Sequence, residues 1–304
     1  MSVPRCFHRV TRGLGGLAAV EDACICVTAD DYGLTKGTNA GIERLAAVGP
    51  LTAVSIMMHA NAELSSVERL RSTPCALGLH LVLVEEVPLL ENRRIAGLLD
   101  SDGRLPTDYR SLFAALLRRP SLLRAIRDEA FAQMERYEGL GLPLNFVNSH
   151  QHVHLFPPIW ATLRPLFVRH PVAVRAARHA RPRLCKQALV EMFGCVSTLL
   201  GPERPIMHPI GLQYSGRLTK ENLAMALRSS HAARSGEIAE LVTHPAIEDG
   251  HLRSRYGHWN YRWQAEYELL GSDCFRMTLD AASVNVRSLR NVRQDGFGSR
   301  SSLQ

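Results

Sequence analysis

The chain has 304 residues, 46% hydrophobic and 21% charged, a composition typical of a globular protein with one large α/β domain or two small ones. The formal net charge is +7, but the arginines are scattered and form no basic block interleaved with aromatic residues, so we do not expect nucleic-acid binding. The longest apolar runs fall short of the roughly 20 residues that a membrane span needs. The seven cysteines include only one close pair, which favours reduced thiols in a cytoplasmic protein over a thiolate zinc site.

The first part of the chain alternates between predicted strands and helices. Residues 1–22 match a signal peptide poorly, so we expect a loose N-terminal extension. Predicted strands cover 23–27, 52–58 and 76–84, and predicted helices cover 36–48 and 61–71. The first of these helices stops at Gly49-Pro50. This alternation is typical of a parallel α/β fold.

The second part continues the pattern after a long irregular segment, 85–110, and loops of that length are often functional. We expect helices over 111–138 (interrupted at Pro120), 158–168, 219–229, 263–270 and 275–282, and strands over 144–149, 172–176, 237–242 and 283–286. Prolines break up residues 177–215, where we predict only a short strand at 212–215. Residues 287–304 are predicted to be a flexible polar tail, which leaves 23–286 as one domain.

Two adjacent carboxylates, Asp30 and Asp31, follow the first predicted strand. Because side chains alternate along a strand, the pair is expected at the strand end, where the backbone turns. One Asp could then hold a metal while the other handles a proton. The simpler alternative is an Asx turn or an N-cap for the next helix.

Other polar residues interrupt or end the later apolar strands: His80, His150, Arg175 and His244. In parallel α/β folds, ligands gather at the carboxyl ends of the strands, so these side chains are expected to converge on one site. For His80 alone, a hydrogen-bonded core residue is the competing interpretation.

Three histidines lie within five residues, at His150, His152 and His154. An extended segment would place all three on one face, whereas a helical turn would pair His150 with His154. A surface turn rich in histidine is the alternative to metal binding. One carboxylate and two imidazoles suit a catalytic divalent metal with an open position for water, which indicates metal-assisted hydrolysis of a carbonyl compound.

At these residues the sequence resembles the YdjC-like carbohydrate deacetylases. The matching segments, in family order, are TADDYG (28–33), TNAGI (38–42), GLHLVLVE (78–85), NSHQHVHLFP (148–157), VRAAR (174–178) and THPA (243–246). The resemblance implies a distorted (β/α) TIM-like barrel related to polysaccharide deacetylases.

The resemblance also implies roles for individual residues. Asp31, His80 and His150 would be ligands of a divalent metal, Zn²⁺ or Mg²⁺, and Asp30 would be the catalytic base. Arg175 would orient that base, and His244 would protonate the leaving amine. The resemblance leaves open whether three further residues contact the metal ligands or the substrate: His152, His154 and Arg178.

The substrate that the resemblance implies is an N-acetylated sugar or glycolipid. Residues 78–88, 98–104 and 215–219 are more similar to the hopanoid-associated branch, which would deacetylate an N-acetylglucosaminyl hopanoid lipid, than to the chitooligosaccharide N-deacetylase branch. A glycolipid substrate would involve peripheral membrane contact, at the inner membrane surface, and a homodimer is left open. The rival interpretations are a phosphoesterase or another metal hydrolase, and a non-catalytic metal-dependent binder of a sugar or lipid headgroup.

Overall fold

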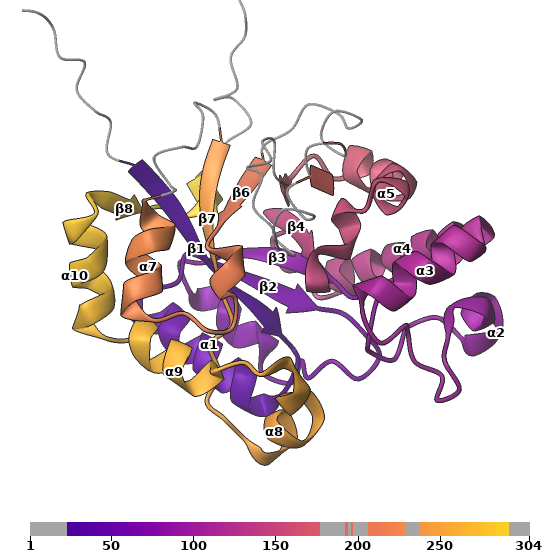
Figure 1. Cartoon of the computed structure of the whole chain (residues 1–304), viewed down its shortest axis with the longest axis horizontal. Coiled ribbons are helices and arrows are strands. Elements are labelled where there is room, and N and C mark those ends of the chain that lie inside the picture. The colour runs from indigo at the N-terminus through magenta and orange to yellow at the C-terminus, as the bar shows by residue number, and fades with distance from the viewer. Residues whose placement is uncertain (1–22, 177–191, 194–195, 197–205, 229–236, 292–304) are drawn as a thin grey trace, which may run out of the picture.

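The computed structural model describes residues 23–176, 192–193, 196, 206–228 and 237–291. Seven parallel strands form a closed barrel in the order β2-β3-β4-β5-β6-β7-β1, in which β1 also pairs with β2 (Figure 1). The barrel strands are β1 (Ala23–Tyr32), β2 (Ala53–Met57), β3 (Ala76–Leu81), β4 (Phe146–Ser149), β5 (Ala173–Arg175), β6 (Ile206–Ile210) and β7 (Glu237–Thr243). An eighth strand, β8 (Val284–Val286), pairs with the beginning of β1. The predicted distorted TIM-like barrel is therefore confirmed.

Helices surround the barrel (Figure 1). They are α1 (Lys36–Val48), α2 (Asn92–Ile95), α3 (Tyr109–Arg118), α4 (Leu123–Gly139), α5 (Pro157–Arg169), α7 (Lys220–Leu227), α8 (Gly250–Tyr256), α9 (Trp263–Leu270) and α10 (Asp273–Ala281). Among the residues described, no helix combines the length and the apolar character that crossing a membrane requires.

Helix α1 has the predicted bounds because both of its ends carry strong signals. The Thr35 side chain accepts a hydrogen bond from the Thr38 N–H, and Gly49 ends the helix in the left-handed conformation with φ 93°. The cap is therefore Thr35. The alternative in which the aspartate pair caps this helix is wrong.

Several predicted elements differ from the structure. The helix expected over 61–71 is a 3₁₀ helix, Val67–Ser72, and the irregular segment 85–110 contains the short α2. The strand expected at 212–215 is a 3₁₀ turn, Leu212–Tyr214, and the strand lies instead at β6. β6 tolerates Pro209 because its register with β5 reaches only Met207, so the missing N–H lies beyond that ladder.

An apolar layer fills the end of the barrel at which the parallel strands begin. It contains one residue from each of six successive strands: Cys26, Ala53, Ala76, Phe146, Ala173 and Met207. A Cβ at Gly78 would overlap the Phe146 ring, so glycine is required there. Two residues further along the strands, the period-2 alternation places polar side chains in the interior, among them Asn148 and Arg175. The polar site therefore lies on top of an apolar plug.

Leu289 belongs to the same apolar layer and is buried, and the Arg287 N–H donates to the Ile25 carbonyl oxygen. The packed part of the chain thus reaches beyond 286, into the segment predicted as a tail. Residues 1–22 and 292–304, predicted as a loose extension and a flexible tail, lie outside the described residues, as does Arg178.

Candidate active site

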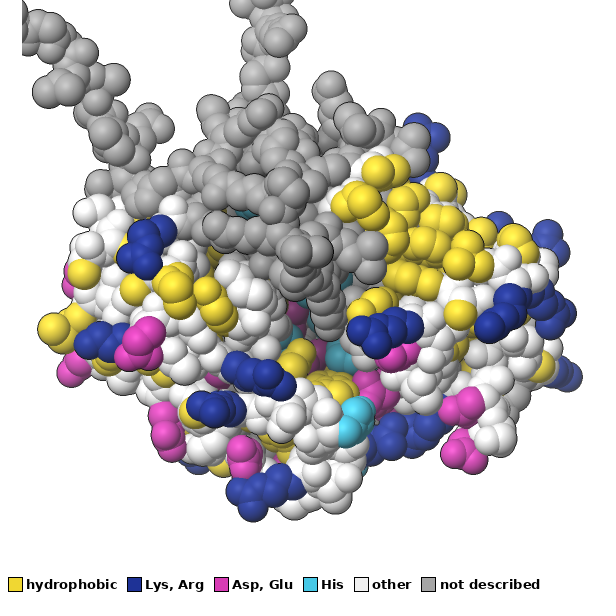
Figure 2. Space-filling view, viewed as in Figure 1, with side chains coloured by type: hydrophobic (Ala, Val, Ile, Leu, Met, Phe, Trp, Pro, Cys, Tyr) yellow, Lys and Arg dark blue, Asp and Glu magenta, His cyan; other side chains and the backbone are white. Residues whose placement is uncertain are grey.

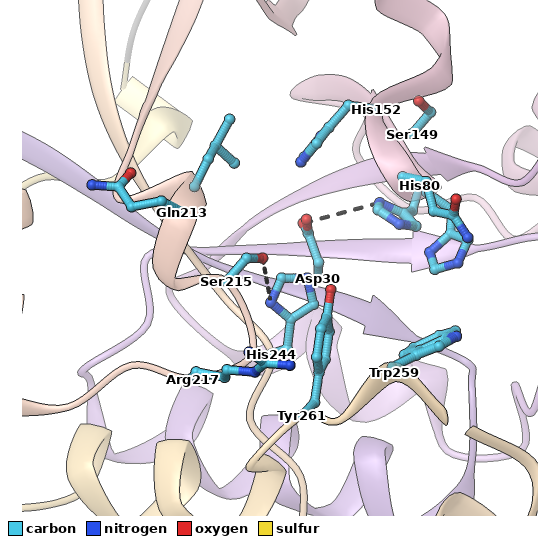
Figure 3. A pocket seen from close by; sticks show the side chains of 13 residues that line it. Asp30, His80, Ser149, His152, Gln213, Ser215, Arg217, His244, Trp259 and Tyr261 are labelled. Carbon is cyan, nitrogen blue, oxygen red and sulfur yellow. Dashed lines mark hydrogen bonds and ion pairs between the residues drawn. The ribbon is translucent and has the colours of Figure 1, made fainter. Parts of the chain in front are cut away.

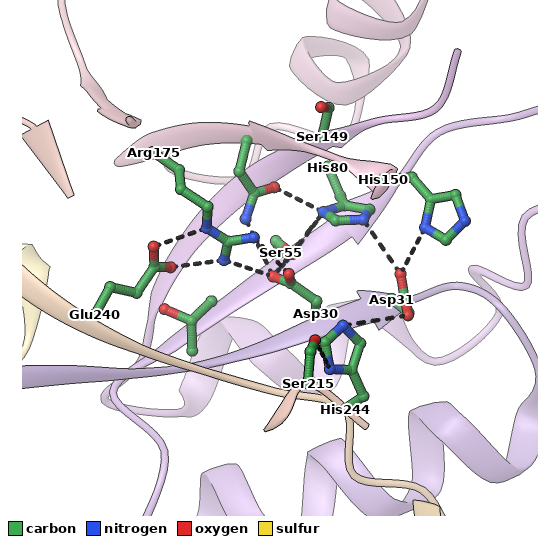
Figure 4. Close-up of polar contacts among 12 residues, drawn as sticks. Asp30, Asp31, Ser55, His80, Ser149, His150, Arg175, Ser215, Glu240 and His244 are labelled. Atoms are coloured by element: carbon green, nitrogen blue, oxygen red, sulfur yellow. Dashed lines mark hydrogen bonds and ion pairs between the residues drawn. The ribbon is translucent and has the colours of Figure 1, made fainter. Parts of the chain in front are cut away.

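The aspartate pair lies inside β1, not after it. Asp31 has φ 67°, and the register between β1 and β2 shifts between Ala29 and Tyr32, which is a β-bulge. Asp30 points into the barrel by strand alternation. The left-handed backbone conformation of Asp31 turns its side chain toward the same site (Figure 4). The bulge, instead of a strand end, allows neighbouring carboxylates to share one site.

Asp30 is buried and accepts four hydrogen bonds. Oδ1 accepts from Ser55 Oγ at 2.7 Å, from Asn148 Nδ2 at 3.1 Å and from an Arg175 guanidinium N–H at 2.9 Å. Oδ2 accepts from the other Arg175 terminal nitrogen at 2.6 Å. Burial alone would raise the pKa of Asp30, but the Arg175 charge outweighs burial and holds that pKa well below its usual range. Asp30 is therefore ionised.

Arg175 is fully buried between two carboxylates. Besides Asp30, it donates from Nε and from a terminal nitrogen to Glu240, both at 2.7 Å. Burial lowers the pKa of Arg175, but the two carboxylates outweigh this effect and raise that pKa. Sequence reasoning missed Glu240. The available signal was an acidic residue within the apolar strand EIAELV, on the same period-2 face as the barrel interior.

Asp31, His80 and His150 come together as the sequence predicted. Each offers one ligand atom, and these atoms lie within 4.8 Å of one another. Asp31 Oδ1 lies 3.2 Å from His80 Nε2 and 3.3 Å from His150 Nδ1 (Figure 4). Burial alone would raise the pKa of Asp31, but the neighbouring histidines, above all the hydrogen bond with His150, outweigh burial and lower that pKa well below its usual range.

Hydrogen bonding fixes which nitrogen of His80 faces this cluster. The ionised Asp30 can only accept, so Asn148 turns its amide nitrogen to Asp30 and its oxygen to His80 Nδ1, at 2.7 Å. His80 Nδ1 therefore carries the proton. Nε2 keeps its lone pair, is buried, and has no hydrogen-bond partner among the described residues. An orphaned imidazole lone pair beside a carboxylate fits a divalent metal ion.

Glu85 is a second residue that sequence reasoning missed. Its Oε2 lies 3.4 Å from His150 Nε2, and the Trp259 indole N–H donates to its Oε1 at 2.9 Å. Burial would lower the pKa of His150, but hydrogen bonds to Asp31 and Glu85 outweigh it and raise that pKa to about 10. The available signal was a carboxylate placed just after an apolar strand, as in the aspartate pair.

The other two histidines of the triple have different surroundings. Residues 150–155 form a 3₁₀ helix in which Gln151 and His152 have φ 52° and 59°, so neither an extended segment nor a regular helical turn is present. His152 lines the pocket. His154 is fully buried and binds Ser149 Oγ through Nδ1 at 2.5 Å and the Arg175 carbonyl oxygen through Nε2 at 2.7 Å. Both nitrogens of His154 are thus engaged away from Asp31.

His244 follows β7 and faces the cluster from the other side. Its Nε2 lies 4.0 Å from Asp31 Oδ2, and its Nδ1 lies 3.3 Å from Ser215 Oγ. Burial lowers the pKa of His244. Its backbone N–H donates to the buried Glu266 at 2.7 Å, which fixes the start of the segment after β7.

A pocket opens above these residues (Figure 3). Trp259 and Tyr261 form an aromatic wall, and the Tyr261 ring meets His244 edge to face at 5.0 Å. The other residues that line the pocket are Asp30, His80, Ser149, His150, Gln151, His152, Leu212, Gln213, Ser215, Arg217 and His244. Such a mixture of aromatic and polar groups can hold a small polar ligand against the acidic and imidazole side chains.

Comparisons with known proteins identify the family of this chain. Residues 24–281 match the model of the YdjC-like protein family. A carbohydrate deacetylase from Oceanobacillus iheyensis is 33% identical over 164 residues, which cover 52% of this chain and 68% of that relative. A carbohydrate deacetylase from Vibrio campbellii is 27% identical over 263 residues, covering 86% and 93% of the two chains.

Among solved structures, a protein from Enterococcus faecalis named for cellobiose-phosphate cleavage has the same fold. The TM-score is 0.71 at 19% identity, and the match covers 89% of this chain and 98% of that one. The family match spans the barrel and every predicted site residue. The chain belongs to the YdjC-like protein family.

Proposed function

We propose that this protein is a metal-dependent N-deacetylase that removes the acetyl group from an N-acetylglucosaminyl substrate. The observation that carries the proposal is the cluster of Asp31, His80 and His150 beside a separately held carboxylate, Asp30, at the base of one pocket. A metal binder without catalysis has little use for that second carboxylate. The relatives named as carbohydrate deacetylases supply the sugar class.

The donor set fits a divalent cation. Two imidazoles and one carboxylate favour Zn²⁺, with Mg²⁺ as the alternative. An ion held by these three residues would polarise the acetyl carbonyl and make its bound water more acidic.

Asp30 and His244 would move the protons. Asp30 Oδ2 accepts one hydrogen bond from Arg175 and keeps lone-pair capacity toward the pocket, so it can take a proton from the attacking water. His244, on the opposite side, would donate a proton to the nitrogen as the carbon–nitrogen bond breaks. The products are acetate, which gains the oxygen of the water, and the free amine.

The aromatic wall suits a sugar ring. Trp259 and Tyr261 present apolar faces beside polar side chains such as Gln213 and Arg217, and a pyranose offers the same combination of apolar faces and hydroxyl edges.

An apolar surface next to the pocket supports a lipid-linked acceptor, such as the glycosylated hopanoid. Figure 2 shows hydrophobic side chains gathered on the side of the molecule that carries α3 and α5. In this region Phe113 stacks on Phe156 with ring centroids 4.1 Å apart, and Leu117 is 75% exposed. The Tyr109 N–H at the start of α3 donates to Gln151 Oε1 on the pocket rim, so this surface begins where the pocket ends. Peripheral membrane contact would follow from such a substrate.

The test is mass spectrometry of the products after metal-loaded protein is incubated with chitobiose and with a glycosylated hopanoid, side by side. We expect loss of one acetyl group from the hopanoid and release of acetate, both abolished by a chelator. Acetyl loss from chitobiose alone would assign the chitooligosaccharide branch instead. Saturable binding without acetyl loss from either compound would refute the deacetylase proposal in favour of a binder, and release of phosphate from a phosphate ester would indicate a phosphoesterase.

A further inference from the structure

We infer that Glu85 is a positioning residue, which fixes the orientation of His150 toward the metal site and ties it to Trp259 in the pocket wall. The inference rests on the metal site of the proposed function and adds to it a residue outside the ligand set. It concerns metal binding and the geometry of the pocket, so it can be tested without measuring acetyl release.

Polar groups from two segments of the chain, 150–151 and 258–259, converge on the Glu85 carboxylate. The Trp259 indole N–H donates to both oxygens, at 2.9 and 3.2 Å, and the Gln151 side-chain amide donates to Oε2 at 3.3 Å. His258 Nε2 lies 3.0 Å from Oε1, and His150 Nε2 lies 3.4 Å from Oε2. Two of these groups, the indole and the amide nitrogen, can only donate, so a group that only accepts suits this position.

This arrangement settles the state of the His150 ring. With Glu85 as acceptor, Nε2 keeps its proton, which leaves Nδ1, 3.3 Å from Asp31 Oδ1, as the nitrogen that would give up its proton and bind a metal ion. A carboxylate behind a metal-bound histidine fixes the ring orientation and raises the basicity of the ligand. Asn148 performs the same task for His80 from the other side of the site.

Glu85 also joins the metal site to the pocket wall. The Trp259 ring lies 5.1 Å from the His150 ring and lines the pocket, and the same carboxylate holds both rings. Movement of Trp259 against a ligand would therefore be transmitted to His150.

The backbone at Glu85 is held in an unfavourable conformation. Its φ is 72°, in the left-handed region that glycine favours and that strains the backbone of a bulky residue. The Glu85 N–H donates to the Pro106 carbonyl oxygen at 2.7 Å, and the Arg104 guanidinium donates to the Glu85 carbonyl oxygen at 3.3 Å. A buried carboxylate whose strained backbone is held by hydrogen bonds with segment 104–106 is what a positioning role requires.

The experiment compares Glu85→Gln with Glu86→Gln. Glu86 is an equally buried carboxylate on the same loop that accepts from the Tyr256 hydroxyl at 2.9 Å, and within the described chain it has no hydrogen bond or ion pair with His150. The measurements are the dissociation constant for Zn²⁺, by competition with a chromophoric chelator, the visible absorption spectrum of the Co²⁺ form, and thermal unfolding. We expect E85Q to bind Zn²⁺ about 10- to 100-fold more weakly and to change the Co²⁺ spectrum, while E86Q binds as the wild type does.

Equal Zn²⁺ dissociation constants for E85Q, E86Q and the wild type would overturn the inference, whether or not the wild type releases acetate. A second measurement needs no variant: nitrogen-15 spectra of the histidine rings in the Zn²⁺-loaded wild type should show His150 protonated at Nε2. A proton on Nδ1 would overturn the inference even if E85Q failed to fold. Failure of the proposed function would instead appear as intact acetyl groups with these metal results unchanged.

Discussion

The substitution Asp30→Asn tests the predicted proton acceptor while leaving the predicted metal ligands, Asp31, His80 and His150, in place. The amide oxygen of the new side chain can still accept from Asn148, so the chain of hydrogen bonds that orients His80 persists. The new NH₂ group, however, takes the position of Oδ2, where it meets an Arg175 N–H donor and cannot accept from it. The variant should bind metal and fail to take a proton.

The structural cost can be separated from the catalytic loss. Breaking a buried ion pair typically costs 3–5 kcal/mol, and we expect about 3 kcal/mol because Arg175 keeps Glu240. Loss of a general base lowers kcat by about 10²- to 10⁴-fold. Glu240→Gln is the matched control, since it breaks the same arginine network and leaves the pocket carboxylate in place. It should be destabilised by a similar amount, roughly 3 kcal/mol, yet keep kcat within about 10-fold.

The assay is acetate release at saturating substrate, together with urea unfolding and the Zn²⁺ dissociation constant. If D30N bound the metal normally and turned over at the wild-type rate, Asp30 would not be the base. If D30N and E240Q lost kcat equally, the loss would come from the disturbed network, and the assignment of Asp30 would again fail.

Two further variants test parts of the site that lie outside the ligand set. Burial raises the pKa of Glu266 to about 7, so the folded state holds a proton that the unfolded state releases near pH 4.5. As the pH rises from about 4.5 to about 7, the wild type should therefore lose roughly 3 kcal/mol of stability, whereas Glu266→Gln should show no such loss. The measurement is urea unfolding at a series of pH values. Parallel pH profiles for the two proteins would contradict this. Gly216 has φ 71°, and a Cβ there would overlap the Tyr261 ring, so Gly216→Ala should displace the pocket wall and raise KM about 10-fold with little change in kcat. An unchanged KM would show that Tyr261 does not contact the substrate.

Most of the barrel could be predicted because its elements carry local signals. Apolar runs mark the strands, and α1 has both a threonine cap and a glycine stop. The failures have physical causes. β6 contains Pro209, which ordinarily argues against a central strand, and the rule fails here because the neighbouring β5 is only three residues long. Helix α8 was not predicted, although Asp249 caps it and Leu252 and Tyr256 are its buried residues.

The candidate site was predicted where polar residues interrupt apolar strands, and missed where acidic residues look like ordinary surface positions. His80, His150 and His244 stand out in such runs. The roles of Glu85 and Glu240 become visible only in the folded barrel, where Glu85 contacts His150 and Glu240 contacts Arg175. No pattern in residues 150–154 indicates a 3₁₀ turn with two successive left-handed residues. Spacing alone therefore could not separate His152 from His154.

The bulge in β1 explains how one dipeptide can supply two different chemical groups. In a regular strand Asp31 would point outward with Val27 and Ala29, toward the helices, where an unpaired carboxylate would be costly. The left-handed conformation at Asp31 costs about 1 kcal/mol or more, and aspartate tolerates it better than most residues. In return, Asp30 keeps the interior position between Arg175 and its amide and hydroxyl donors, and Asp31 reaches the imidazoles. A glycine at this position would relieve the backbone but remove the proposed metal ligand, so the proposed site requires a residue that combines this conformation with a carboxylate.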